Sequence, residues 1–366
     1  MRRLASVFGM LLAVSGCAPL LEISVVQKAV AIATFDPLPP DPAVGHSGGH
    51  EVASFLEVGH PLATTITSAE HGAIDLAGLV AAARAHDVIW IGVQPHNPQA
   101  YRFAARYMRA LARGGVRAPL LLGAVPGDAD PQLRTRFGGT TRQQASALSD
   151  SLPWEEFGVD DPVVMPGMIE PVIRAAIEAR LPLHAGGSSR DTIDAFRNAR
   201  ASSTDAFALG LDLPWHRTRM QALAFALEED FEHCPAPPPP VSEQEVLLDR
   251  VESAGVASRV LEMLPAKSVG TNKSPAKSVG TRHPAVIVIA ELRHGRRDVG
   301  APHTLEALAQ RRGRAVKQLT VGIEEASWDR EQIAQYNAEI GRNDVLWLTE
   351  PIYDVAAVAP DRLCVR

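Results

Sequence analysis

The sequence is poor in cysteine and lacks the short motifs that mark the common metal and hydrolase sites. Its 366 residues include three cysteines, and no Cys-x-x-Cys pair is present, which argues against a structural zinc site. Gly-x-Ser-x-Gly and His-Glu-x-x-His are both absent, and no glycine loop has Walker spacing. There is no basic block either, and the formal charge of −6 argues against a nucleic-acid partner. The hydrophobic content of 46% is ordinary for a globular protein that buries a full core.

The first 17 residues are typical of a bacterial lipoprotein signal. A charged start, Arg2-Arg3, precedes an apolar segment from Leu4 to Val14 that is too short to span a bilayer. The segment ends in Val-Ser-Gly-Cys17, which matches the lipobox. An ordinary signal peptide with a chance cysteine is the alternative, but position, small residues and cysteine agree, so we expect a lipid on Cys17 as a membrane tether. Ala18, in place of aspartate, resembles the sorting signal for the outer membrane, facing the periplasm or the cell surface.

Behind this segment the sequence predicts a three-layer α/β fold. Apolar runs typical of buried strands alternate with helical periodicity, which favours a mainly parallel sheet with helices on both faces. The expected strands cover residues 87–92, 118–123, 181–185, 285–290, 316–323 and 345–349. Helices are expected at 75–86, 167–180, 191–199, 303–312 and 329–340, with one more after Pro98.

One block interrupts the alternation, so the α/β domain is predicted in two parts. Residues 203–264 contain two long helical patterns, 214–233 and 242–264, and no strand pattern, which predicts an inserted all-helical subdomain. The heptapeptide Pro-Ala-Lys-Ser-Val-Gly-Thr follows at 265–271 and again at 275–281, which predicts a flexible loop. The predicted layout is a signal peptide at 1–17, a flexible tether at 18–58, α/β parts at 59–202 and 285–366, the helical insertion at 203–264 and the repeat loop at 265–284.

Two cysteines, Cys234 and Cys364, remain beside the lipidated one. In an oxidising compartment, such an even pair suggests one disulfide bond. We therefore predict a bond between them, which requires their Cα atoms to lie within about 7 Å of each other.

A strand–loop–helix unit begins at Val88 and opens at the end of a sheet, where ligand sites of open α/β sheets lie. The apolar run ends at Gly92, Asn97 is a good N-cap, and Pro98 occupies the favoured first helical position. His96 and Tyr101 then occupy positions that commonly touch. The contact is either a simple staple that closes the start of the helix, or a histidine hydrogen-bonded to a tyrosinate ligand of haem.

A second polar segment follows the strand predicted at 285–290. It runs from His294 to Asp298 and includes Arg296. A charged surface loop is one interpretation, but its position after the most strand-like run of the sequence favours a site. His184 also ends an apolar strand, and it is as consistent with a hydrogen-bonded core residue as with a ligand.

These two segments resemble the ChaN-like family of haem-binding uptake lipoproteins, in the wider Tiki superfamily that includes erythromycin-esterase-like enzymes. The likeness begins at His60-Pro61-Leu62 and extends to the end of the chain. In the family's strand–loop motif, which corresponds to the segment after Val88, this chain keeps Gly92, Asn97 and Pro98. A second family motif aligns without a gap from Glu291 onward, and there the chain keeps His294, Arg296, Asp298, Gly300 and Pro302.

The resemblance implies a haem-binding lipoprotein of iron uptake. It implies a tyrosinate axial ligand, for which Tyr101 or Tyr107 is available, with His96 and His294 in the same site and Arg296 near a haem propionate. The implied partners are haem and, through the lipid, a membrane; an outer-membrane receptor is compatible with the sequence but not identified by it.

Departures from the family bear on the alternative functions. The superfamily's enzymes are thought to need a Glu and a His in the strand–loop motif for metal-assisted or general-base hydrolysis. At these two positions this chain has Val93 and Pro95, which can neither ligate a metal nor carry a proton. No divalent metal is therefore expected, and a catalytic role is not favoured. Two alternatives stay open: a metal-dependent hydrolase of the Tiki or erythromycin-esterase type, and a non-catalytic remnant of the fold acting as an interaction module.

Overall fold

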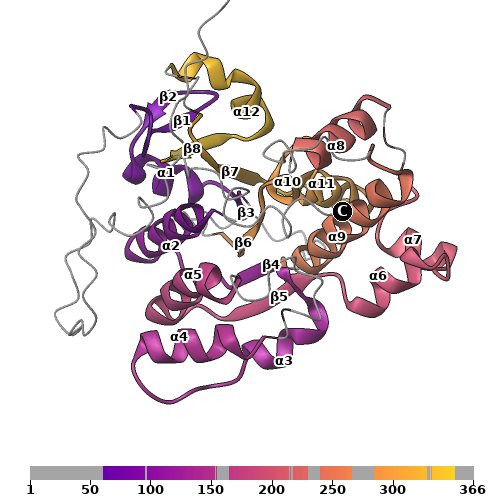
Figure 1. Ribbon diagram of the computed structural model, residues 1–366, viewed down its shortest axis with the longest axis horizontal. Coiled ribbons are helices and arrows are strands. Elements are labelled where there is room, and N and C mark those ends of the chain that lie inside the picture. The colour runs from indigo at the N-terminus through magenta and orange to yellow at the C-terminus, as the bar shows by residue number, and fades with distance from the viewer. Residues whose placement is uncertain are drawn as a thin grey trace, which may run out of the picture. The chain divides into compact units, whose positions relative to one another are not determined.

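Within the part of the chain that the structure describes, eight strands form one sheet in the order β2-β1-β8-β7-β3-β6-β4-β5 (Figure 1). The computed structural model describes residues 61–94, 97–152, 154, 165–213, 215, 217–229, 240–265, 284–327, 330 and 332–350. The chain divides into two units, Met1–Phe55 and Leu56–Arg366, and every described residue belongs to the second. Cys17, Cys234 and Cys364 lie outside the described residues, as do the predicted tether and nearly all of the repeat loop.

The six strands from β8 to β5 run parallel, which confirms the predicted mainly parallel sheet. Two short strands, β1 and β2, add an antiparallel edge that the sequence analysis did not predict, because three residues are too few to show a period. The strands are β1 Ile66–Ser68, β2 Gly72–Ile74, β3 Val88–Val93, β4 Leu120–Pro126, β5 Leu183–Gly187, β6 Val286–Glu291, β7 Gln318–Glu325 and β8 Val345–Thr349.

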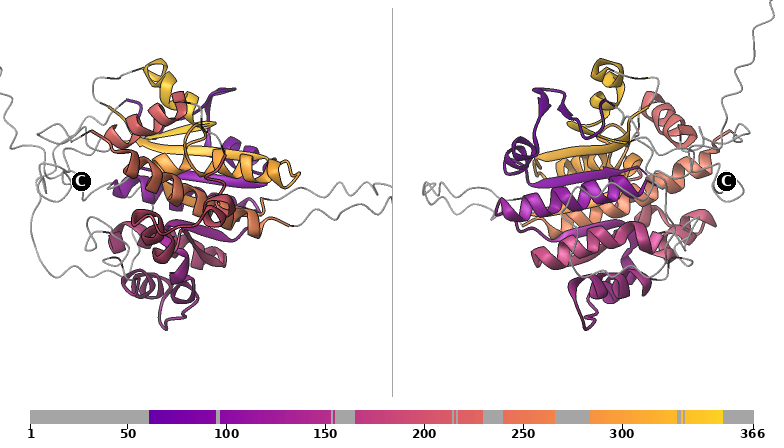
Figure 2. Two further views of the ribbon diagram at one scale, coloured as in Figure 1. Left: turned by 90° about the vertical axis from the view of Figure 1, so that its right-hand side faces the viewer. Right: turned by 60° about the vertical axis from the view of Figure 1, so that its left-hand side comes forward.

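Helices cover both faces of the sheet, so the fold has the three predicted layers (Figure 2). Strand β3 is apolar throughout because both of its faces are buried. Ile89 and Ile91 pack into the core on one face, whereas Val88 and Trp90 pack into the core on the other. The first face is covered by α1 (Leu76–Ala83), α2 (Pro98–Arg113), α4 (Thr141–Asp150) and α5 (Met165–Ala179), and the second by α9 (Glu243–Met263) and α11 (Ala301–Arg311).

The predicted helical block contains α7 (Ser203–Ala208), α8 (Arg217–Glu229) and α9. Its longest helix, α9, packs against β5, and its Val256 and Val260 belong to the same buried hydrophobic cluster as residues of β3 and β6. Gly255 allows this approach: a Cβ at that position would lie 2.0 Å from the Oγ of Ser188. Helix α9 is therefore part of the second helical layer, and the predicted boundaries of the insertion stay a prediction.

Shorter helices connect the strands. They are η3 (Gly127–Ala129), α3 (Asp130–Leu133), α6 (Arg190–Arg197), α10 (Leu292–Gly295), η5 (Ile333–Tyr336) and α12 (Asn337–Arg342). The helix predicted at 329–340 is instead a 3₁₀ turn followed by the short α12, so that prediction was wrong in length and in type. No helix among the described residues combines the length and apolarity needed to cross a membrane.

Candidate functional site

The loop after β3 is fixed by Asn97, as the sequence predicted. Its buried side chain accepts hydrogen bonds from the backbone N–H groups of Gln99 and Ala100, at 2.9 and 3.0 Å. Its amide also donates to the Oγ1 of Thr349 at 3.2 Å, which ties the start of α2 to the end of β8. Asn97 is thus both a helix cap and a link between two strand ends. His96 lies outside the described residues, so its predicted contact with Tyr101 stays a prediction.

Tyr101 lies in the hydrophobic core rather than at an open surface, with 3% of its area exposed. Burial raises the pKa of its phenol far above the ordinary value, and the charge of Glu291 raises it further. Tyr107 is fully buried, its hydroxyl lies 3.5 Å from the carbonyl of Leu79, and burial raises its pKa as well. Both phenols are therefore protonated core groups. Ligation of haem iron by Tyr101 stays a prediction, and it would require the start of α2 to open.

The two segments that carry the family resemblance meet at the carboxyl end of β3. Helix α10 follows β6 directly, and a Cβ added at Gly295 would lie 2.7 Å from the Cα of Gly92. Gly300 comes similarly close, because its Cβ would lie 2.4 Å from the carbonyl oxygen of His294. Only glycine fits such approaches. Segments about 200 residues apart in the sequence thus form one edge of the sheet.

His294 projects from α10 onto α9 and forms what we call the His294 cluster, with Asp249, Glu252 and Ser253. Its Nδ1 lies 2.9 Å from the Oγ of Ser253, and its Nε2 lies 3.3 Å from a carboxylate oxygen of Glu252 and 3.7 Å from one of Asp249. His294 and Asp249 are buried, whereas the side chain of Glu252 is 44% exposed. The cluster therefore opens toward solvent on the Glu252 side.

The charge of the His294 cluster favours the imidazolium form. Burial lowers the pKa of His294, and Arg293 opposes its charge as well, but the carboxylates of Asp249 and Glu252 outweigh both, and the net pKa lies above 6.5. Arg293 also donates from Nε to Asp249 at 2.7 Å and pairs with Glu291 at 3.0 Å. A histidine between two carboxylates is either an imidazolium ion pair or, after losing its proton, a metal ligand.

Arg296 is buried, and Asp298 engages its guanidinium in two hydrogen bonds. Nε donates to Oδ1 at 3.0 Å, and a terminal nitrogen donates to Oδ2 at 2.8 Å. This fork geometry holds the loop between α10 and α11. The predicted pairing of Arg296 with a haem propionate would have to compete with Asp298 and stays a prediction.

Tyr101 and His294 are not brought together. Tyr101 belongs to the core under α2, on one face of the sheet, whereas His294 contacts α9, which covers the opposite face. The physical reason is that both faces of the sheet are covered, so that α2 packs its side chains on one face and α9 receives His294 on the other. Among the predicted site residues that the structure describes, His294 lies in a cluster of several polar side chains that reaches solvent through Glu252.

The His294 cluster could hold a divalent cation. Asp249, Glu252 and His294 offer one ligand atom each, and these atoms all lie within 4.8 Å of one another. One imidazole and two carboxylates suit zinc or manganese. Sequence reasoning missed Asp249 and Glu252, although a signal existed: Asp249 and Ser253 occupy the apolar stripe of α9 that begins at Val246, where a polar residue needs a partner.

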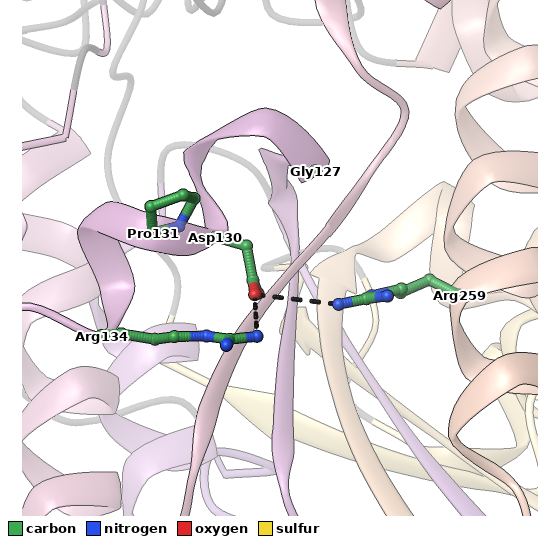
Figure 3. Close-up of a pocket in the computed structure, with 5 residues that line it drawn as sticks. All are labelled: Gly127, Asp130, Pro131, Arg134 and Arg259. Carbon is green, nitrogen blue, oxygen red and sulfur yellow. Dashed lines mark hydrogen bonds and ion pairs between the residues drawn. The ribbon is translucent and has the colours of Figure 1, made fainter.

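A separate cleft surrounds Asp130, with a volume of about 460 Å³ and two arginines on its walls (Figure 3). The Asp130 carboxylate accepts a hydrogen bond from the backbone N–H of Ala185 at 2.9 Å. It lies between Arg134, the C-cap residue of α3, and Arg259 of α9. His184 Nδ1 is 3.4 Å from the same carboxylate. Asp130 thus joins α3, β5 and α9, and His184 lies beside this carboxylate at the wall of the cleft.

Comparisons with known proteins yielded structural neighbours only. No family model matches the sequence, and no curated protein matches it significantly. The structure is similar to ChaN of Campylobacter jejuni, solved with cofacially bound haem, at a TM-score of 0.48 and 12% identity, covering 77% of this chain and 95% of that one. It is also similar to the type III effector HopBA1, at a TM-score of 0.34 and 13% identity, covering 75% and 92%. At these values neither neighbour assigns a ligand or an activity to this chain.

Proposed function

We propose that this protein is a haem-binding lipoprotein whose ligand meets the carboxyl edge of the sheet around α10. The supporting observation is that the two segments that resemble the haem-binding family, at Gly92 and from His294 to Pro302, pack against each other at that edge. A lipid on Cys17 would anchor the protein at the outer membrane, as the lipobox predicts. An outer-membrane receptor would then be the natural partner for delivering haem.

The described tyrosines do not fit the axial role in their present positions. Tyr101 and Tyr107 are buried and protonated, and Tyr336 accepts a hydrogen bond from the backbone N–H of Ser327 at 2.6 Å. His294 is the residue at this edge that could supply a nitrogen to iron once its proton is lost. Its partly exposed neighbour Glu252 marks the side from which a ligand would approach.

A titration of the mature protein with haemin, followed through the Soret absorption of the haem, tests this proposal. We expect saturable binding by the parent. If His294 is the ligand, His294→Ala shifts the spectrum while Tyr101→Phe does not; if the start of α2 opens, Tyr101→Phe loses the high-spin spectrum and Tyr107→Phe retains it. A titration in which the parent shows no saturable Soret change would refute the proposed function.

A divalent cation at the His294 cluster is a second candidate, and the 4.8 Å ligand triangle is the observation that favours it. It departs from the expectation of no divalent metal, which rested on Val93 and Pro95 and did not consider carboxylates from α9. A bound cation would supply a polarised water for hydrolysis. Glu252, the partly exposed member of the triangle, would be the ligand nearest solvent.

Calorimetric titration of the chelator-treated protein with Mn²⁺ and Zn²⁺ tests this candidate. Binding should release the proton of His294 and should weaken at least about tenfold, or about 1.4 kcal/mol, in His294→Asn and Asp249→Asn. Glu262→Gln is the matched control, because Glu262 is an exposed carboxylate on the same helix. Equal binding by the parent and by His294→Asn would place the metal elsewhere.

A further inference from the structure

A second pocket lies between α8, α9 and α11, away from the residues assigned above. It has a volume of about 160 Å³, and its functional side chains are Trp215, Arg219, Arg250, His303 and Thr304. We call it the Trp215 pocket. These residues come from three helices and from the segment before α8, so no local sequence pattern predicts the pocket.

The Trp215 pocket carries two guanidinium groups, and no carboxylate of the described residues lines it. Among the described residues, no carboxylate pairs with Arg219 or with Arg250 within ion-pair distance. Arg250 donates from a terminal nitrogen to the carbonyl of Leu211 at 3.2 Å, but its Nε is buried and has no hydrogen-bond partner. A buried donor without an acceptor is costly, so the pocket holds unused hydrogen-bonding capacity.

The surrounding groups hold both guanidiniums in place without neutralising them. The Arg250 guanidinium lies 4.6 Å from the ring centroid of Trp215, and that of Arg219 lies 6.0 Å from it. The ring of His303 meets the Trp215 ring edge-on at 5.8 Å, and its Nε2 contacts Arg219. Burial first, and the charges of Arg219 and Arg250 after it, lower the pKa of His303 to about 4 against a weaker opposing effect of Asp298, which is paired with Arg296. His303 is therefore neutral at neutral pH and can accept from Arg219.

We propose that the Trp215 pocket binds a compact oxyanion, the phosphoryl or carboxylate group of a small ligand. Paired guanidiniums recognise such groups through charge-assisted, often bidentate hydrogen bonds. The anion would supply the counter-charge that Arg219 and Arg250 lack and the acceptor that the Arg250 Nε lacks. The small volume excludes haem and admits a group of a few heavy atoms. This site goes beyond the proposed function, because it uses neither His294 nor the carboxyl edge of the sheet.

Calorimetric titration of the full chain with inorganic phosphate and, separately, with malonate tests the proposal at constant ionic strength. We expect saturable binding of one of them, and the stronger of the two identifies phosphoryl or carboxylate as the preferred group. Arg250→Gln and Arg219→Gln should each weaken that binding at least about tenfold. Arg259→Gln is the matched control: it removes a guanidinium of α9 that lies at Asp130, and it should bind like the parent.

Tryptophan fluorescence gives a second readout that does not depend on heat. The anion should change the emission of the parent, and Trp215→Phe should lose that change while thermal unfolding shows that the variant is folded. Absence of saturable binding of both anions to the folded parent would overturn the proposal. Unchanged binding in the Arg219→Gln and Arg250→Gln double variant would overturn it as well.

Discussion

Two histidine clusters lie beside the same helix and differ in their counter-charges. Asp249 and Arg250 are consecutive residues of α9, and the first faces His294 while the second faces Trp215 and His303. In the His294 cluster, carboxylates raise the pKa of the imidazole, whereas in the Trp215 pocket burial and a guanidinium lower that of His303 to about 4. The same residue type is thus a cation in one place and a neutral acceptor in the other.

This difference separates a self-sufficient cluster from an incomplete one. The His294 cluster satisfies its charges internally, since Arg293 and His294 face Asp249 and Glu252. Among the described residues, the lining of the Trp215 pocket includes two arginines and no carboxylate, and neither arginine forms an ion pair. A cluster of the first kind needs no ligand to compensate its charges, whereas one of the second kind gains from binding an anion.

The largest effect is expected from Asp249→Ala. The substitution leaves Arg293 and His294 without their shared buried counter-charge, and breaking such a pair costs about 2–4 kcal/mol. Urea unfolding of the metal-free protein at pH 6 measures it. A loss below about 0.5 kcal/mol would mean that water replaces the carboxylate, and the cluster would then not be self-sufficient.

The sequence made part of this arrangement predictable. Local signals placed β3, the Asn97 cap and α9 within a few residues, because a strand, a cap and an amphipathic helix each depend on neighbouring residues. The His294 cluster depends on how α9 is rotated on the sheet, which Gly255 and Ser188 help to decide across distant segments. The burial of Tyr101 likewise follows from which face of α2 meets the sheet, and spacing alone could not separate a staple from a ligand.

The two histidines should respond to pH with opposite signs. The raised pKa of His294 means that its stabilising contribution is present below pH 6.5 and is lost as the pH rises through that pKa. The lowered pKa of His303 means that its contribution is present above pH 6.5 and is lost as the pH falls toward about 4.

An NMR titration of the imidazole resonances in the chelator-treated protein measures the pKa values of His294 and His303 directly. On acidification, the resonances assigned to His294 should shift first and those of His303 last. His294→Gln and His303→Gln supply the assignments. If both imidazoles titrated near 6.5, the contrast in charge between the two clusters would be refuted.

A smaller effect is expected from Arg250→Met, next to Asp249 in the chain. Removing an unpaired, half-buried cation relieves a desolvation cost, which offsets the lost contact with Trp215 and the hydrogen bond to Leu211. We expect a net change within about 1 kcal/mol in urea unfolding without added anion. With phosphate present, the parent should gain stability and this variant should not. A loss as large as that of Asp249→Ala would show that Arg250 is a structural residue.

The smallest effect on stability is expected from Glu252→Gln. The Glu252 side chain is 44% exposed, and exposed ion pairs contribute about 0–1 kcal/mol, so unfolding in urea should change by less than that. The substitution nevertheless removes one of the two carboxylates that raise the pKa of His294, and the NMR titration should move that pKa downward. Glu262→Gln, at an exposed position of the same helix, should leave it unchanged. A pKa of His294 that is equal in the parent and in Glu252→Gln would leave Asp249 as the sole counter-charge, and Glu252 would then lose its assigned role at the solvent side of the cluster.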